Sequence, residues 1–294
     1  MHKMLSDRKA FLVFVAPAFF LYIVIVLIPV VWSVVYSFQE GSILSGFRFV
    51  GFGNFVKLWT DREFIYSLLF GLRYAVVVTT GQIVFGFLLA LLYTFYLKRA
   101  SSFIRTIIFF PAVLPTVAVG TMFVKIFEIA PQYGLVNALF EAFHLNSWIQ
   151  PWLGQASTAF VVVVIMDIWR SMGFYAIILY SGILDISDEI IEAARLDGAQ
   201  RLSLVRYIVM PLLRPILVTS IIFSLNGTLK VFDSLMALTG GGPGSTTTPL
   251  TLYMYKTAFD FNQYGYGSTI AIFLMLESLF VTLLFYRYAR RDLA

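Results

Sequence analysis

Residues 11–35 have the sequence FLVFVAPAFFLYIVIVLIPVVWSVV, which contains no charged side chain. A helix rises ~1.5 Å per residue, so about 20 apolar residues cross the ~30 Å hydrocarbon core of a bilayer. Arg8 and Lys9 precede this run, and basic residues also precede the apolar part of a secretory signal peptide. The run is longer than such a segment and lacks a small-residue cleavage site, so we expect a retained transmembrane helix.

The rest of the chain repeats this pattern. Of its 294 residues, 60% are hydrophobic and 13% are charged, against about 25% charged in soluble domains, which excludes a water-soluble or disordered protein. We therefore expect an all-α polytopic membrane protein, 1–294, that forms one domain and contains no strand. The segments between spans are shorter than the ~50 residues that a separate soluble domain needs, so no nucleotide-hydrolysing domain is expected. The expected spans are 11–35, 74–96, 106–127, 159–184, 212–232 and 266–286.

Residue types that support covalent chemistry are scarce. The chain has no cysteine, and its two histidines are His2 and His144. Disulfides, thiolate nucleophiles and cysteine or histidine metal clusters are therefore excluded, and no catalytic or metal-binding residue is expected. The net charge of +5 does not indicate nucleic-acid binding, because the basic residues form short clusters beside the apolar runs.

The positions of these basic clusters predict the orientation in the membrane. With the N-terminus in the cytoplasm, 13 of the 21 Lys and Arg residues lie in cytoplasmic segments, and five lie in outer loops. Cytoplasmic loops are enriched in Lys and Arg, so both termini are expected in the cytoplasm. The cytoplasmic set comprises Lys3, Arg8, Lys9, Lys98, Arg99, Arg105, Arg195, Arg201, Arg206, Arg214, Arg287, Arg290 and Arg291.

The cytoplasmic loop 185–211 has the signals of two short helices. Ser187 can cap a helix whose first turn contains Asp188 and Glu189, where acidic groups suit the helix dipole. Gly198 fits the left-handed position that ends a helix, and a second helix is expected from about residue 201 to 211. Ile190 and Ile191 lie four and three residues before Ala194 and give the first helix a small apolar face. An interfacial amphipathic loop would explain that face, but not the small pair Ala193-Ala194, which lets another protein approach closely.

The same loop resembles a known motif. Glu192-Ala193-Ala194, three residues, Gly198, nine residues, Ile208 and then Met210-Pro211 resemble the EAA loop of ABC importer permeases, with Met210 replacing the family's leucine. Other stretches resemble carbohydrate-uptake permeases of the maltose and multiple-sugar type. They are Asp197-Gly198-Ala199, Phe232-Asp233, Thr239 before Gly241-Gly242-Pro243, Asn54-Phe55 with Asp61 and Phe64, and Gly134 with Asn137.

This resemblance implies a type I ABC importer permease fold in a bacterial or archaeal inner membrane. It implies one of two permease subunits of an ATP-driven importer for a di- or oligosaccharide, working by alternating access. The implied partners are a second homologous permease, two cytoplasmic ATPase subunits that use ATP and Mg, and an extracellular or periplasmic sugar-binding protein; this chain itself would hold no cofactor. The ATPase-coupling residues implied are Glu192, Ala193, Ala194, Arg195, Asp197 and Gly198. The alternative, a self-contained secondary transporter, would need internal repeats, and none is visible between the halves.

The resemblance also implies a sugar site between spans four and five. Aromatic residues there can stack on a sugar ring, and hydroxyls can bond to its hydroxyls, although ordinary packing between spans is the alternative. Arg170, Gly227 and Val231 depart in bulk and polarity from the maltose case. The residues implied are Trp169, Arg170, Ser171, Phe174, Ser224, Gly227, Thr228 and Val231.

Charged residues at membrane depth are a further sign of a functional interior. Asp167 and Arg170 are three residues apart and can pair on one face of span four. They could form a structural ion pair, a cavity wall or part of a proton relay. Lys230 and Asp233 lie at the end of span five, and the sequence assigns them no role.

Overall fold

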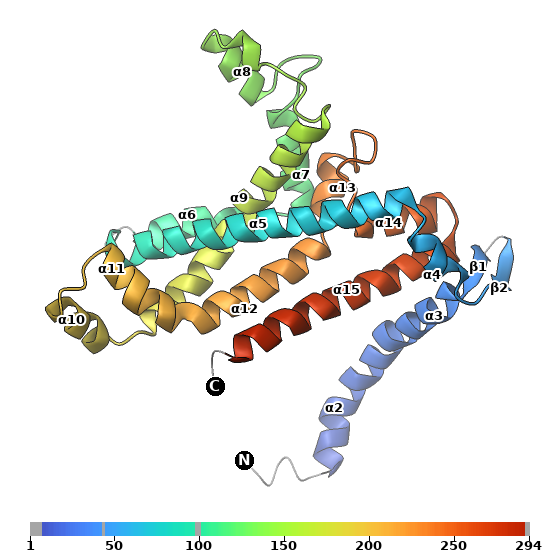
Figure 1. Ribbon diagram of the computed structural model, residues 1–294, viewed down its shortest axis with the longest axis horizontal. Helices are drawn as coiled ribbons and strands as arrows, with labels where there is room; N and C mark the ends of the chain where they lie inside the picture. The colour runs from blue at the N-terminus through green and yellow to red at the C-terminus, as the bar shows by residue number, and fades with distance from the viewer. Residues whose placement is uncertain (1–7, 43–44, 98–100, 292–294) are drawn as a thin grey trace. The chain divides into compact units, whose positions relative to one another are not determined.

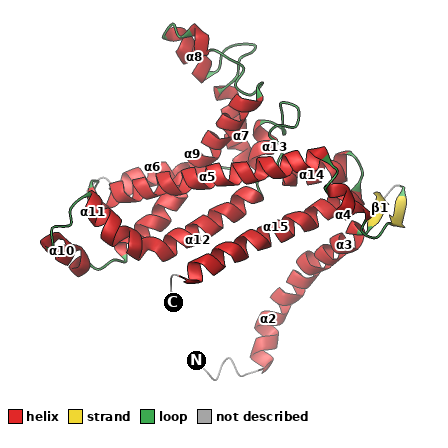
Figure 2. Cartoon of the chain, viewed as in Figure 1, coloured by secondary structure: helices red, strands yellow, loops and turns green. Residues whose placement is uncertain are grey.

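The computed structural model describes residues 8–42, 45–97 and 101–291, most of them in helices (Figure 2). The chain forms two compact units. The first unit contains residues up to Phe64 together with Tyr253–Leu276, and the second contains Ile65–Leu252 and the residues from Glu277 onward. Lys3, Lys98 and Arg99, which the orientation argument uses, lie outside the described residues.

Among the described residues, five helical segments are long and apolar enough to cross a membrane, and a bent pair of helices brings the number to six. This number agrees with the six spans expected, although several helices extend beyond the expected limits. The five segments are Val13–Ser37 (α2, Arg8–Tyr22; η1, Ile23–Leu27; α3, Ile28–Ser37), α5 (Arg62–Phe95), α9 (Ala156–Leu184), Leu202–Leu229 (α11, Leu202–Leu204; η3, Val205–Val209; α12, Met210–Leu229) and Tyr264–Arg287 within α15 (Tyr264–Arg291).

The third expected span, 106–127, is broken, which corrects the prediction of one continuous helix. Helices α6 (Ser101–Val113) and α7 (Thr116–Ile126) meet at 96°, and Figure 1 shows α7 turning sharply away from the line of α6. The break occurs at Pro115, whose ψ of 128° is extended. A proline disfavours helical geometry in the residue before it and has no N–H to donate, so this ring ends α6.

The second unit is held together by small residues and an apolar core. A Cβ atom on Gly173 of α9 would lie 2.2 Å from the carbonyl oxygen of Ile108, so α9 packs directly on the backbone of α6. Small residues allow such close approach between membrane helices. Helices α5, α7, α9 and α13 (Asp233–Leu238) share a core that comprises Tyr74, Val78, Val119, Phe123, Val162, Val163, Val164, Met166, Leu235 and Leu238.

The first unit contains a short hairpin that the sequence analysis did not expect. Strands β1 (Gln39–Ser42) and β2 (Gly46–Phe49) pair antiparallel, with Gln39 opposite Phe49. The Asn54 amide of α4 (Gly53–Leu58) donates to the carbonyls of Ser37 at 3.0 Å and Gln39 at 2.8 Å. The strands are only four residues long, and β1 contains no large apolar residue, so the pair gives little sequence signal.

Asp61 joins the start of α5 to two later segments of the first unit. One carboxylate oxygen accepts from the backbone N–H groups of Glu63 and Phe64, at 3.0 and 3.4 Å. The other accepts from the hydroxyls of Tyr253 in α14 (Leu250–Tyr255) and Tyr266 in α15, each at 2.5 Å. We call Asp61, Tyr253 and Tyr266 the Asp61 clamp. Partial burial would raise the pKa of Asp61, but these four hydrogen bonds outweigh it and lower that pKa below its ordinary value of 3.8.

The Asp61 clamp predicts a pH-dependent contribution to stability. Because the pKa of Asp61 is lowered in the folded chain, its contribution is fully present above the ordinary value and is lost as the pH falls through the folded value. Asp61→Ala should lower the free energy of unfolding at pH 7 by about 2 kcal/mol, since four donors lose a charged acceptor. The measurement is the thermal unfolding midpoint in detergent between pH 7 and pH 3, and the difference between variant and parent should shrink below about pH 4.

The neighbouring exposed acid provides the matched control. Glu63→Ala removes the same charge but leaves the Asp61 carboxylate in place, so its unfolding midpoint should follow that of the parent. Equal destabilisation by the two substitutions would show that the clamp contributes nothing beyond net charge.

Candidate functional site

A cavity of about 250 Å³ lies in the second unit, between α5, α9 and α12. Seven of the eight residues expected at a sugar site line it. Trp169 does not: it packs on Phe123 of α7, with ring centroids 5.6 Å apart, beside the apolar core. The lining comprises Tyr74, Gln82, Ala112, Asp167, Arg170, Ser171, Phe174, Tyr175, Phe223, Ser224, Gly227, Thr228 and Val231.

Hydroxyl and amide groups form one side of the cavity. Ser224 Oγ lies 2.7 Å from Gln82 Oε1 and 2.9 Å from Thr79 Oγ1, and Thr228 Oγ1 donates to the Ser224 carbonyl at 2.9 Å. Gln82 Nε2 in turn donates to the Asp167 carbonyl at 3.2 Å. A hydroxyl has one hydrogen and two lone pairs, so these side chains are positioned with acceptor capacity to spare.

Aromatic rings and a glycine form another side. The ring centroids of Phe174 and Phe223 lie 5.9 Å apart, and Phe223 is 60% exposed. Gly227 lies one helical turn after Phe223, and a Cβ atom built on it would meet no atom within 4 Å. Any side chain at position 227 would therefore enter open space. Phe223 was not singled out from the sequence, although its four-residue spacing from Gly227 could have indicated it.

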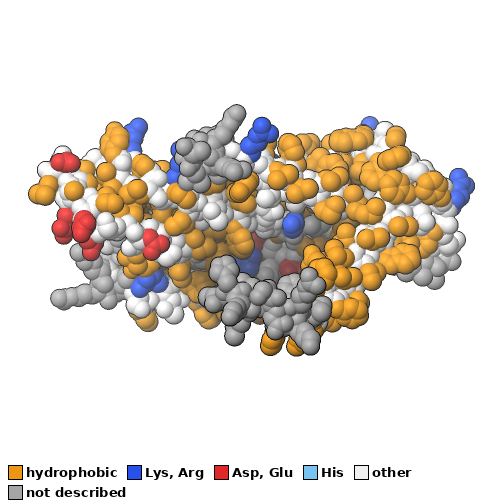
Figure 3. Space-filling model, turned by 90° about the horizontal axis from the view of Figure 1, so that it is seen from below, with side chains coloured by type: hydrophobic (Ala, Val, Ile, Leu, Met, Phe, Trp, Pro, Cys, Tyr) orange, Lys and Arg blue, Asp and Glu red, His pale blue; other side chains and the backbone are white. Residues whose placement is uncertain are grey.

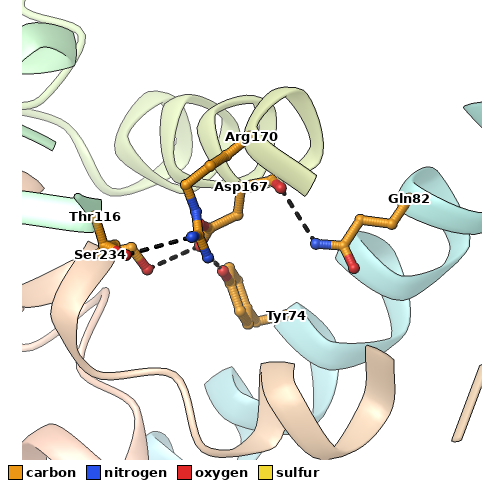
Figure 4. A network of polar contacts seen from close by, with 6 residues as sticks. All are labelled: Tyr74, Gln82, Thr116, Asp167, Arg170 and Ser234. Atoms are coloured by element: carbon orange, nitrogen blue, oxygen red, sulfur yellow. Dashed lines mark hydrogen bonds and ion pairs between the residues drawn. The ribbon is translucent and has the colours of Figure 1, made fainter. Parts of the chain in front are cut away.

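A charged network ties the cavity wall together (Figure 4). One Asp167 oxygen accepts from Tyr74 Oη of α5 and from Ser234 Oγ of α13, the latter at 2.9 Å. The other lies 3.5 Å from Arg170 Nε, an ion pair without the alignment of a hydrogen bond. Arg170 Nη1 also donates to Thr116 Oγ1 at the start of α7, at 3.3 Å.

This geometry confirms that Asp167 and Arg170 pair on one face of α9, as their spacing predicts. It makes them both a structural pair and part of the cavity wall. Asp167 is 3% exposed, and its partners come from α5 and α13, which sequence spacing could not identify. Lys230 directly follows α12 and Asp233 begins α13; both are exposed, and neither lines the cavity. Within the described residues, no group of three His, Asp or Glu side chains could hold a metal ion.

The loop after α9 forms the expected short helix. Helix α10 (Asp188–Leu196) begins after Ser187, whose backbone is extended but whose side chain makes no capping hydrogen bond. Gly198 has φ +89° and ends the helix, with the Ala199 N–H donating to the Ala194 carbonyl at 2.8 Å. The second helix begins at Leu202 and continues through η3 into α12, so it is longer than expected.

The exposed face of α10 differs from the expected one. Ala194 is 7% exposed and packs into the chain, so it is not a surface knob. The exposed residues of the motif are Glu192, Ala193, Arg195, Asp197 and Gly198. Acidic side chains gather at the left edge of the view in Figure 3, where α10 lies. Leu196 is 89% exposed and Leu202 is 78% exposed, which gives this end of the second unit two apolar side chains that the motif did not indicate.

Comparison with known proteins agrees with this architecture. Residues 82–293 match the family model described as binding-protein-dependent transport system inner membrane component. The chain is 34% identical to the multiple sugar-binding transport system permease protein MsmF of Streptococcus mutans, over 84% of each chain. It is 32% identical to the probable starch degradation products transport system permease protein AmyD of Thermoanaerobacterium thermosulfurigenes, over 90% of this chain and 88% of the relative.

A solved structure has the same fold. It is a chain of a bacterial alginate ABC transporter in complex with an alginate pentasaccharide-bound periplasmic protein. The TM-score is 0.84 at 21% identity, and the match covers 99% of this chain and 97% of that chain. The fold of an ABC importer permease therefore extends over nearly the whole sequence.

The charged network predicts an asymmetric response to substitution. Asp167→Ala should lower the free energy of unfolding by about 3 kcal/mol, because Arg170 loses its counter-charge and two hydroxyls lose their acceptor. The double variant Asp167→Ala with Arg170→Met should be more stable than the single variant, because it removes the unpaired charge. Thermal unfolding of the purified chain measures both, and a double variant less stable than the single would contradict the pairing.

Proposed function

This chain belongs to the family of binding-protein-dependent transport system inner membrane components, and from that membership we propose that it is a permease subunit of an ATP-driven di- or oligosaccharide importer. The observation that carries the proposal is the cavity in the second unit. Its combination of aromatic rings, hydroxyls, an amide and a charged pair is suited to a sugar, which offers both apolar C–H faces and hydroxyl groups.

Phe174 and Phe223 supply the surface on which a sugar ring would stack. Ser224, Thr228 and Gln82 supply acceptors for its hydroxyls, while the Arg170 guanidinium, with five N–H groups, retains donors beyond its bond to Thr116. The volume of about 250 Å³ lies below the ~300–1,000 Å³ of typical ligand pockets. A second permease subunit would supply the other half of the translocation path and complete the enclosure of a longer sugar.

Energy would come from other subunits. The chain would take no part in ATP hydrolysis and hold no cofactor; two ATPase subunits would use ATP and Mg in the cytoplasm. Alternating access requires an assembly with two states, each favoured by a ligand at a different end. The sugar-bound binding protein would act at the outer end and the ATPase at α10. The excess of Lys and Arg in the segments assigned to the cytoplasm supports an orientation with both termini inside.

Helix α10 is the proposed contact with the ATPase. Its exposed apolar side chain, Leu196, can enter a groove on a partner, as amphipathic helices do, while Glu192 and Arg195 can fix the register through charge pairs. Ala194 would support this surface from within the chain, and Ala193 would allow close approach on the outer side.

Substitutions in the cavity should impair transport without preventing assembly. Thr228→Val and Ser224→Ala should each lower the rate of sugar uptake roughly fivefold to tenfold, because each removes a polar contact of about 1 kcal/mol. Gly227→Leu should lower uptake further, because its side chain would enter the cavity. The measurement is uptake of labelled malto-oligosaccharides of two to four sugar units by the complete complex in proteoliposomes.

Thr219→Val on the same helix provides the control. Thr219 is exposed, lies outside the cavity, and donates to the Pro215 carbonyl, so its replacement should leave uptake unchanged. Normal uptake by all three cavity variants, with the complex intact, would remove this site from the proposal.

Substitutions in α10 should uncouple ATP hydrolysis from transport. Leu196→Asp should weaken binding of the ATPase, because it places a charge at an apolar contact. Gly198→Val should reduce stimulated hydrolysis, since a β-branched residue opposes a positive φ, whereas Gly198→Asn should retain most activity because asparagine tolerates that conformation. A Cβ atom at 198 meets no atom within 4 Å, so only backbone conformation distinguishes these two variants. ATPase activity of the purified complex with and without the binding protein tests this, and unchanged stimulation in Leu196→Asp and Gly198→Val would contradict the coupling role.

A further inference from the structure

A second pocket, of about 410 Å³, lies in the first unit and is more polar than the sugar cavity in its lining. In the orientation proposed above, with both termini in the cytoplasm, its lining residues belong to outer segments, one ending at the start of α5 and one between α12 and the start of α15. The lining comprises Lys57, Thr60, Asp61, Arg62, Tyr253, Thr257, Phe261, Gln263 and Tyr266.

The charged groups of this pocket that can still bind a ligand are cations. The Asp61 carboxylate already accepts four hydrogen bonds, two of them from Tyr253 and Tyr266, so it is turned toward the protein. Lys57 Nζ donates to Gln263 Oε1 at 3.3 Å and lies 4.1 Å from the centre of the Tyr266 ring. An ammonium group has three N–H donors, so Lys57 retains two for a ligand.

Arg62 adds a second positive charge at the pocket. Its side chain is exposed, and no acid within the described residues forms an ion pair with it. Lys57 and Arg62 therefore present two cations, with donors to spare, around a space that a side chain can enter. Beside them, Phe259 and Phe261 are 54% and 62% exposed and add apolar surface, the mixture of aromatic centre and polar rim that protein interfaces show.

We propose that this pocket receives a carboxylate, from an Asp or Glu side chain of the sugar-binding protein. The inference rests on the proposed function, which places a binding protein at this side of the membrane. A free carboxylate would gain little from two solvent-exposed cations, because exposed ion pairs are weak. A carboxylate on a docked protein is held in position by the other contacts of that protein. Lys57 and Arg62 can then steer the encounter and fix the register of the two proteins.

The test uses the complete importer in nanodiscs, with the sugar-loaded binding protein titrated against ATP hydrolysis. Lys57→Gln with Arg62→Gln should raise the half-saturating concentration of binding protein roughly threefold to tenfold and weaken its dependence on salt. The maximal stimulated rate should stay at the parent value, because neither residue lies in the sugar cavity or in α10. Arg48→Gln, which removes one charge from the exposed strand β2 of the same unit, should leave the half-saturating concentration unchanged.

If the double variant has the same half-saturating concentration as the parent, the pocket's role is overturned. Stimulation of the parent complex by its binding protein would still leave the proposed function intact. No stimulation of the parent by its binding protein would instead overturn the proposed function itself.

Carbodiimide cross-linking identifies the source of the carboxylate. Mass spectrometry should show Lys57 joined to an Asp or Glu of the binding protein, and the product should disappear in Lys57→Gln. The competing source is a free acidic sugar, for which glucuronate serves as the probe. Glucuronate bound at low millimolar concentration in a Lys57-dependent manner, with no cross-link to the binding protein, would overturn the assignment to a protein side chain.

Discussion

A carboxylate deep in a membrane protein must find its partners within the protein, because the surrounding lipid offers none. Asp167 meets this requirement with groups from separate helices: Tyr74 on α5, Ser234 on α13 and Arg170 on its own helix. Arg170 then reaches Thr116 at the start of α7. One buried acid thus fixes where four helices meet, and the cavity lies beside that point because the same residues form its wall.

The lengths of the apolar runs predicted most of the helices, since the thickness of the bilayer sets the number of residues in each span. The bend between α6 and α7 could not be located in the same way. Pro111 and Pro115 both lie in the third apolar run, but Pro111 stays inside α6 while Pro115 ends it. The difference depends on tertiary packing, including the close approach of α9 at Gly173. The hairpin was missed because its strands are only four residues long and β1 has no large apolar residue.

The residues that line the cavity were likewise only partly predictable, because tertiary packing decides which side chains reach it. The family resemblance implied seven of the lining residues, which lie on α9 and on α12 or just after it. Trp169 is adjacent to Arg170, yet successive helix positions lie about 100° apart, and its ring turns to the core. Gln82 and Tyr74 reach the cavity from α5, and nothing in their own spacing marks them. Ala194 was placed on the wrong face for the same reason, because the motif gives the order of residues but not the rotation of α10.

The empty space beside Gly227 has a consequence for how importers of this kind diversify. Several residues that line the cavity also hold the structure together: Asp167 joins the helices, and Ser224 donates a hydrogen bond to Gln82. Changing any of them would disturb packing as well as selectivity. Position 227 is different, because a Cβ atom there meets no atom within 4 Å and the side chain would extend into the cavity. A lineage could therefore explore different sugars by single codon changes at one residue, without breaking the hydrogen bonds that join the helices around the cavity.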